Sequence, residues 1–212
     1  MCRRVLLCLT MAMLVIGCTR QVVGSPALPY TETPGPVVVL AADADDLMLD
    51  LARMRAITGA GEALTAIPSM DGKYPVDIDV LARGVPQPCR FIFAETETFS
   101  QNMADFHKTT YQRPPGAGLI SQAAAVYRDP QTARAAFDGL VDRATACAES
   151  SAGPTFVGYV ASGEDSLQLR PARTCGRDYQ LKSTVLVEVT FCEFPESVPG
   201  IVMTNILSKV PG

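Results

Sequence analysis

The chain is poor in the residues on which catalytic and metal sites most often depend. It has a single histidine, His107, and no CxxC pair, HExxH, P-loop or GxGxxG pattern. A nucleophilic triad needs a base beside the nucleophile, and His107 stands in no GxSxG or comparable setting. We therefore predict that the protein is not an enzyme and that it has no catalytic residue, no metal site and no cofactor.

The sequence also lacks a run of basic residues and an apolar run long enough to cross a membrane comfortably. Its 18 basic residues are outnumbered by 22 acidic ones, which makes nucleic acid a poor candidate partner. The N-terminal apolar run from Val5 to Ile16 would form a helix of about 18 Å. The hydrocarbon core of a bilayer is about 30 Å thick. The run therefore favours a signal peptide over a transmembrane helix.

The segment Leu14-Val15-Ile16-Gly17-Cys18 has the pattern of a lipobox. Arg3 and Arg4 precede the apolar run, and a small residue leads directly to the cysteine. We predict that residues 1–17 are a lipoprotein signal peptide and that Cys18 carries diacylglycerol and palmitate. The mature protein would then be anchored at the extracytoplasmic face of the cell membrane. Ordinary secretion or an uncleaved anchor would not explain a cysteine directly after glycine.

The remaining chain is long enough for one folded domain. Removal of residues 1–17 from the 212-residue chain leaves 195 residues, which suits one domain or a domain plus a tail. Hydrophobic residues make up 48% of the sequence, which excludes wholesale disorder. Prolines and small polar residues are frequent in residues 19–36 and indicate an extended tether. We predict a lipidated cysteine and tether over residues 18–36 and a folded domain over residues 37–212.

The seven cysteines sort into groups with different roles. Cys2 and Cys8 leave with the signal peptide, and Cys18 carries lipid. An even number of cysteines outside the cytoplasm implies two disulfides, with three pairings possible among the four that remain: Cys89, Cys147, Cys175 and Cys192.

Residue patterns predict an α+β domain in which helices pack on an antiparallel sheet. Asp43, Asp45 and Asp46 favour a capped helix ending at Gly59 over a calcium loop, because the segment lacks the glycine and the ligand spacing of such a loop. Asp129-Pro130 begins a second helix, with an apolar stripe reaching Cys147. A third helix is expected over residues 196–209. Strands are predicted from apolar alternation and turn residues over residues 37–40, 105–112, 119–127, 155–161, 166–169, 175–181 and 184–192.

Beyond these patterns, the chain resembles a known family. The lipobox and Pro-rich tether are followed by PQPCRF, QAAAVYRDPQTARAAFDGLVDRATAC, CGRDYQLKSTVLVEVTFC and ILSKVP. Over residues 37–212 this order is similar to the PknH-like extracellular sensor domain of mycobacteria and their relatives. Some members are the outer domain of a receptor Ser/Thr kinase, and many are stand-alone lipoproteins. One departure is that the family often has tryptophan before the second cysteine, where this chain has Ala144 and Thr145.

The resemblance implies a structure as well as a role. It implies Cys89–Cys147 and Cys175–Cys192 disulfides, and a twisted antiparallel β-sheet packed against helices. It also implies a cleft that binds a ligand. The missing tryptophan leads us to expect different local packing, and with it a different pocket shape.

The predicted function is a cell-envelope lipoprotein whose sensor-type domain binds a small molecule or a cell-wall component. The candidate ligand residues are Tyr111, Arg113, Tyr127 and Arg128, because an aromatic residue and a cation recur at the ends of two neighbouring predicted strands. The simpler interpretation is that these are ordinary residues around a turn. Two other functions stay open: a protein-interaction module for an envelope receptor or wall enzyme, and a lipid carrier. A polar cleft would favour sensing, a flat apolar patch a protein partner, and a closed apolar cavity a lipid carrier.

Overall fold

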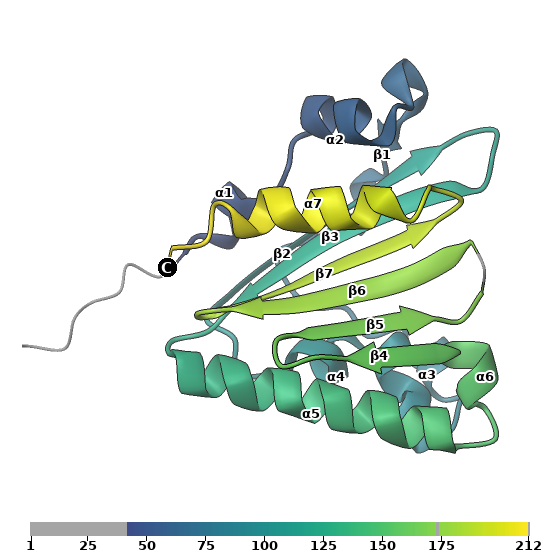
Figure 1. The fold of residues 1–212 in the computed structure, drawn as a ribbon, viewed down its shortest axis with the longest axis vertical. Coiled ribbons are helices and arrows are strands. Elements are labelled where there is room, and N and C mark those ends of the chain that lie inside the picture. Colours follow the sequence, from purple (N-terminus) through teal and green to yellow (C-terminus); the bar gives the residue numbers. More distant parts are fainter. Residues whose placement is uncertain (1–41, 173, 212) are drawn as a thin grey trace, which may run out of the picture. The chain divides into compact units, whose positions relative to one another are not determined.

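A seven-stranded antiparallel sheet forms the centre of the domain in the computed structural model, which describes residues 42–172 and 174–211 (Figure 1). The strand order is β1-β2-β3-β7-β6-β5-β4. The strand bounds are Thr65–Ala66, Asp105–Arg113, Gly118–Val126, Tyr159–Ser162, Ser166–Arg170, Cys175–Lys182 and Val185–Cys192 for β1 to β7. The predicted strand over residues 37–40 and the predicted lipobox lie outside the described residues.

Two hairpins, β2–β3 and β6–β7, form the middle of the sheet. β2 and β3 pair from Asp105↔Val126 to Arg113↔Gly118, close to the predicted strands over residues 105–112 and 119–127. β3 then pairs with β7, which comes about 60 residues later in the chain. The run Ala123–Ala125 lies in β3 although alanine favours helices. Helices cover both faces of the sheet here, and small side chains allow close packing on both.

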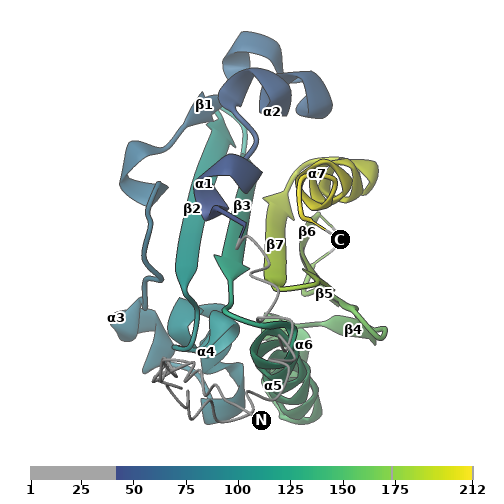
Figure 2. The same ribbon diagram turned by 90° about the vertical axis from the view of Figure 1, so that its left-hand side faces the viewer.

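The helices divide between the two faces of the sheet, each with its own core (Figures 1 and 2). In β7, Val185, Val187 and Val189 face one core and Leu186 faces the other, in agreement with the predicted alternation. The first core packs α1 (Ala44–Leu47), α2 (Leu51–Thr58) and α7 (Ser197–Leu207). The second packs α4 (Glu95–Phe99), α5 (Pro130–Glu149), α6 (Gly153–Phe156) and the 3-10 helix η3 (Gln87–Ile92). The remaining short elements are α3 (Asp79–Ala82), η1 (Gly61–Ala63) and η2 (Pro68–Met70).

The helix predicted from Asp43 to Gly59 is in fact two helices. Asp43 caps α1 as expected, but Asp50 caps α2 by accepting a hydrogen bond from the Arg53 backbone N–H at 2.7 Å. Between the two helices, the Gln122 side chain binds both backbone groups of Leu49, at 3.0 and 2.7 Å. These tertiary hydrogen bonds replace the helical ones and break the helix, which helical spacing alone did not reveal.

The longest helix, α5, begins and ends where the sequence predicts. The Asp129 carboxylate accepts a hydrogen bond from the Thr132 backbone N–H at 2.7 Å, and Pro130 occupies the first turn. The strand predicted over residues 155–161 begins later, because Gly153 and Pro154 start α6 instead. Proline is well tolerated in the first turn of a helix and disrupts a strand ladder.

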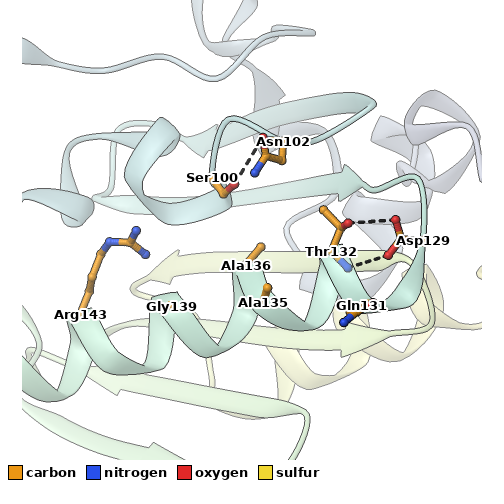
Figure 3. A pocket seen from close by; sticks show the side chains of 9 residues that line it. All are labelled: Ser100, Asn102, Asp129, Gln131, Thr132, Ala135, Ala136, Gly139 and Arg143. Carbon is orange, nitrogen blue, oxygen red and sulfur yellow. Dashed lines mark hydrogen bonds between the residues drawn. The ribbon is translucent and has the colours of Figure 1, made fainter.

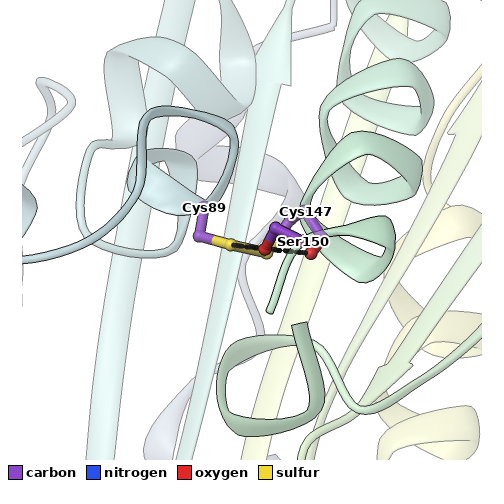
Figure 4. Close-up of a disulfide and its surroundings, with 3 residues drawn as sticks. All are labelled: Cys89, Cys147 and Ser150. Carbon is purple, nitrogen blue, oxygen red and sulfur yellow. Dashed lines mark hydrogen bonds between the residues drawn. A yellow bond between two sulfur atoms is a disulfide. The ribbon is translucent and has the colours of Figure 1, made fainter. Parts of the chain in front are cut away.

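Two disulfides brace the domain, in the pairing that the family resemblance implies. Cys89 in η3 bonds to Cys147 near the end of α5, where the Ser150 hydroxyl donates to the Cys147 carbonyl at 2.7 Å (Figure 4). Cys175 and Cys192 face each other in the β6–β7 ladder. The first bond ties η3 to α5 on one face of the sheet, and the second closes a hairpin.

The beginning and the end of the described chain lie together. The Lys209 ammonium, just after α7, donates hydrogen bonds to the carbonyls of Asp46 and Met48 at 2.9 and 2.8 Å. The first and last helices of the domain are therefore joined by direct polar contacts.

Candidate functional site

The four side chains predicted to line a ligand site do not converge. Tyr111 is buried in the first core, where its hydroxyl donates to the Leu49 carbonyl at 2.9 Å, and burial raises its pKa to about 12. Tyr127 is buried in the second core. Tyr111 pairs with Ile120, so about seven residues of β3, or roughly 24 Å, separate the two tyrosines along the strand.

The two arginines of that set also lie at opposite ends of the β2–β3 hairpin, Arg113 at its turn and Arg128 beyond the far end of β3. Arg113 stacks over the Phe194 ring and donates to the Glu193 carbonyl at 3.3 Å. Arg128 is exposed before α5. A shared ligand-binding role for the four residues stays a prediction that their positions do not favour.

His107 connects three segments of the chain. Its Nδ1 lies 2.9 Å from Asp45 in α1, and its Nε2 lies 3.0 Å from Asp71 after η2. Lys73 pairs with the same Asp45 carboxylate. These contacts fix α1 and the η2 segment against β2, which is a structural role. Among residues 42–172 and 174–211, no group of three His, Cys, Asp or Glu side chains could hold a metal ion.

A groove of about 480 Å³ runs between α5 and the loop that follows α4 (Figure 3). Its volume lies within the range of small-molecule sites, about 300 to 1,000 Å³. The N-cap Asp129 and Arg143 are the outermost lining residues along α5, and the fourteen residue steps from one to the other rise by about 21 Å. The groove is therefore long and narrow. Its lining residues are Ser100, Asn102, Asp129, Gln131, Thr132, Ala135, Ala136, Gly139 and Arg143.

The walls of the groove follow from local sequence. Small residues at Ala135, Ala136 and Gly139 leave space along one face of α5. On the other side, Ser100 has a positive φ of 64° and turns the chain out of α4. The Tyr127 hydroxyl donates to the Phe99 carbonyl at 2.6 Å and so fixes the loop just before Ser100. Tyr127 thus supports a wall of the groove without lining it.

The two charged groups of the groove differ in what they bind. The Asp129 carboxylate accepts hydrogen bonds from the Thr132 backbone N–H and hydroxyl, at 2.7 and 2.9 Å, and these bonds lower its pKa. Arg143 is half-buried and makes no hydrogen bond or ion pair with any residue that the structure describes. The cation is available to a ligand, whereas the carboxylate serves as a helix cap.

A second hollow of about 420 Å³ lies between the start of α5 and the β6–β7 turn. Its charges already have partners: Arg134 pairs with Asp165, and the Lys182 ammonium donates to the carbonyls of Leu207 and Val210. This hollow is therefore less suited to a charged ligand than the groove along α5.

A buried charge cluster lies on the sheet face toward η3. Burial alone would raise the pKa of Glu188, but the positive charges of Lys108 and Arg177 outweigh it, and the pKa is lowered. The Thr190 hydroxyl donates to Glu188 at 2.7 Å, and Arg177 donates to the Ile92 carbonyl at 2.9 Å. Alternation along β7 places Glu188 on the face opposite the valines, but alternation alone does not indicate that the side chain is buried. This cluster stabilises the interior of the sheet.

No helix among the described residues is both long enough and apolar enough to span a bilayer. A search of curated proteins finds no match to the chain. Among solved structures, the chain is similar to the extracellular domain of PknH from Mycobacterium tuberculosis, with a TM-score of 0.54 and 15% sequence identity over 78% of this chain and 93% of that one. At this identity the likeness shows the fold alone.

The family comparison agrees with the fold. The family model described as the PknH-like extracellular domain matches residues 39–209, which include the sheet, both disulfides and the groove along α5. That match covers most of the 212-residue chain. The chain belongs to the PknH-like extracellular domain family.

Proposed function

We propose that this protein is a cell-envelope lipoprotein that binds a small polar ligand in the groove along α5 and catalyses no reaction. The observation that carries the proposal is the groove itself. Its walls offer hydrogen-bonding side chains, and its arginine, Arg143, forms no hydrogen bond or ion pair with any described residue. The extracellular family supports a location outside the cytoplasm. The lipobox supports anchoring to the membrane through Cys18.

The character of the hollows favours a polar ligand over a lipid. The groove and the second hollow both open to solvent and are lined largely by hydroxyl, amide and charged side chains. A lipid carrier needs a closed apolar volume, and neither hollow has that character. The sensing interpretation is therefore the better supported of the two.

A matched pair of variants on α5 tests the proposal. Ala135→Leu places a larger side chain in the groove, whereas Ala146→Leu makes the same change at an exposed α5 position outside it. Native mass spectrometry of protein purified from its own envelope should detect a bound small molecule in wild type and in Ala146→Leu, and lose it in Ala135→Leu. A ligand retained equally by both variants would contradict binding in the groove.

An exposed apolar segment supports a second function, binding to a protein partner. Residues 74–81, here called the strap, expose five large apolar side chains: Tyr74, Val76, Ile78, Val80 and Leu81. The strap is fixed to the domain, because Ile78 donates its backbone N–H to the Phe93 carbonyl at 2.7 Å and the Asp77 carboxylate binds Thr96. Apolar surface held outward in this way is typical of an interaction surface. An envelope protein that co-purifies with wild type and with Ala135→Leu, but not with Val76→Lys, would favour this function.

A further inference from the structure

We infer that the ligand of the α5 groove carries a carboxylate or phosphate group and that Arg143 binds this group. The inference rests on the proposed function, since it assigns chemistry to the same groove. It adds the class of ligand and the residue that selects it.

The first argument is that Arg143 is exceptional among the half-buried arginines of the described residues. The other half-buried arginines in the described residues all have partners in the protein, which are carboxylate, amide or carbonyl oxygens: Arg55, Arg90, Arg113, Arg134, Arg170 and Arg177. Arg143 has none among the residues that the structure describes, although Asp138 and Asp142 lie nearby on α5. A guanidinium that loses part of its hydration gains most from an oxyanion that replaces the lost water.

The second argument is the glycine one turn before Arg143. Glycine is disfavoured inside a helix, yet Gly139 lies in the middle of the 20-residue α5. A Cβ added at Gly139 would lie only 3.3 Å from Arg143 Nη1. The missing side chain therefore lets the guanidinium lie close along the helix face. Figure 3 shows the Arg143 side chain extending from α5 toward the side on which Ser100 lies.

The third argument concerns the remaining walls of the groove. Between Asp129 and Arg143, the polar lining consists of uncharged groups, the hydroxyls of Ser100 and Thr132 and the amides of Asn102 and Gln131. These groups suit an elongated ligand with an oxyanion at one end and uncharged polar groups along its length. The chain is acidic overall, with a net charge of −4, so its field does not attract anions. Selection of an oxyanion must therefore come from a local contact, and Arg143 provides it.

Two simple oxyanions test the inference on the folded wild-type protein by NMR. The probes are N-acetyl-tetra-alanine with a free C-terminal carboxylate, the same peptide with a C-terminal amide, and inorganic phosphate, all at constant ionic strength. We expect the free-acid peptide or phosphate to shift the Arg143 Nε–H, Gly139 amide and Asn102 side-chain signals. A response to the peptide alone assigns a carboxylate, and a response to phosphate alone assigns a phosphate group.

Three variants separate a contact at Arg143 from a general charge effect. Arg143→Gln should weaken binding of the responding oxyanion about tenfold or more, and Gly139→Ala should weaken it by displacing the guanidinium. Arg83→Gln removes one exposed charge elsewhere and should leave binding unchanged.

Two results would overturn the inference. One is that the free-acid and amide peptides bind with equal affinity and that Arg143→Gln changes neither affinity. The other is the absence of any Arg143-dependent shift with either oxyanion at millimolar concentration. Neither result bears on whether the groove binds a ligand at all, which the Ala135→Leu experiment tests separately. Failure of the inference and failure of the proposed function therefore give different results.

Discussion

Glu188 carries a negative charge in the interior of the domain. Its side chain is buried on the sheet face toward η3, with Thr190 donating to it and with Lys108 and Arg177 supplying positive charge. Lys108 also pairs with Glu95, so the loss of Glu188 would leave Arg177 and the Thr190 hydroxyl, rather than Lys108, with less compensation.

We expect Glu188→Gln to lower the free energy of unfolding by about 1 to 3 kcal/mol, because it removes the charged acceptor of the Thr190 hydroxyl and the buried negative charge that acts on Arg177. Urea unfolding followed by circular dichroism measures the change. Glu164→Gln is the matched control, since it makes the same substitution at an exposed turn position and should have little effect.

The same residue predicts a pH dependence. The pKa of Glu188 in the folded protein is lowered from its ordinary value of 4.5, so its contribution to stability is present above that value. The contribution is lost as the pH falls through the folded-state pKa. As the pH falls below about 4.5, wild type should therefore lose more stability than Glu188→Gln. Equal losses of unfolding free energy in wild type and Glu188→Gln would show that Glu188 is not the source of the pH dependence.

Single residues also show what sequence reasoning could not reach. Alternation placed Glu188 on the face of β7 opposite the valines, which is correct, but burial depended on helices whose position on that face the pattern does not encode. The four residues predicted to bind a ligand do not lie together, for a geometric reason. Tyr111 lies near the turn of the β2–β3 hairpin, whereas Tyr127 follows the far end of β3.

At the scale of elements, the Cys89–Cys147 disulfide joins the short helix η3 to the long helix α5 across 58 positions of sequence. A loop of this length contributes about 4 kcal/mol by the chain-entropy estimate. The Cys175–Cys192 bond closes a separation of 17 positions and contributes about 3 kcal/mol by the same estimate. The β6–β7 ladder holds those strands together in any case, whereas η3 depends more on its bond.

Cys147→Ala should lower the melting temperature and leave Cys89 reactive to alkylation. In the control, Cys175→Ala combined with Cys192→Ala keeps the first bond, so Cys89 should stay unreactive. Thermal unfolding and peptide mapping after treatment with iodoacetamide measure both effects. An unchanged melting temperature in Cys147→Ala would count against a structural role for the bond.

The elements that sequence predicted well are those whose signals are local. Asp129 and Pro130 mark the start of α5, and the turn residues between β2 and β3 mark that hairpin. The break between α1 and α2 was missed because it depends on Gln122, which lies about 70 residues away in the chain. The groove was missed for a similar reason, since Ser100 and Arg143 line one groove only because α4 and α5 pack on the same face of the sheet.

For the whole molecule, the lipobox predicts the compartment and the attachment. Mass spectrometry of protein from its native host should find a diacylglycerol thioether on Cys18 as the first residue of the mature chain. Cys18→Ala should release the protein from the membrane fraction, whereas the double variant Cys175→Ala, Cys192→Ala should leave it there. An unmodified Cys18 in membrane-associated protein would refute the anchor.

If the domain is attached through its N-terminus, as the lipobox predicts, the contact between Lys209 and the segment of α1 has a mechanical consequence. Any tension transmitted along the tether would reach α1 first. There the Lys209 ammonium, near the C-terminus, is hydrogen-bonded to the carbonyls of Asp46 and Met48. The force would thus be distributed over the first and the last helix of the domain before it acted on the sheet. The groove along α5 lies on the opposite face of the sheet and would keep its shape under such tension.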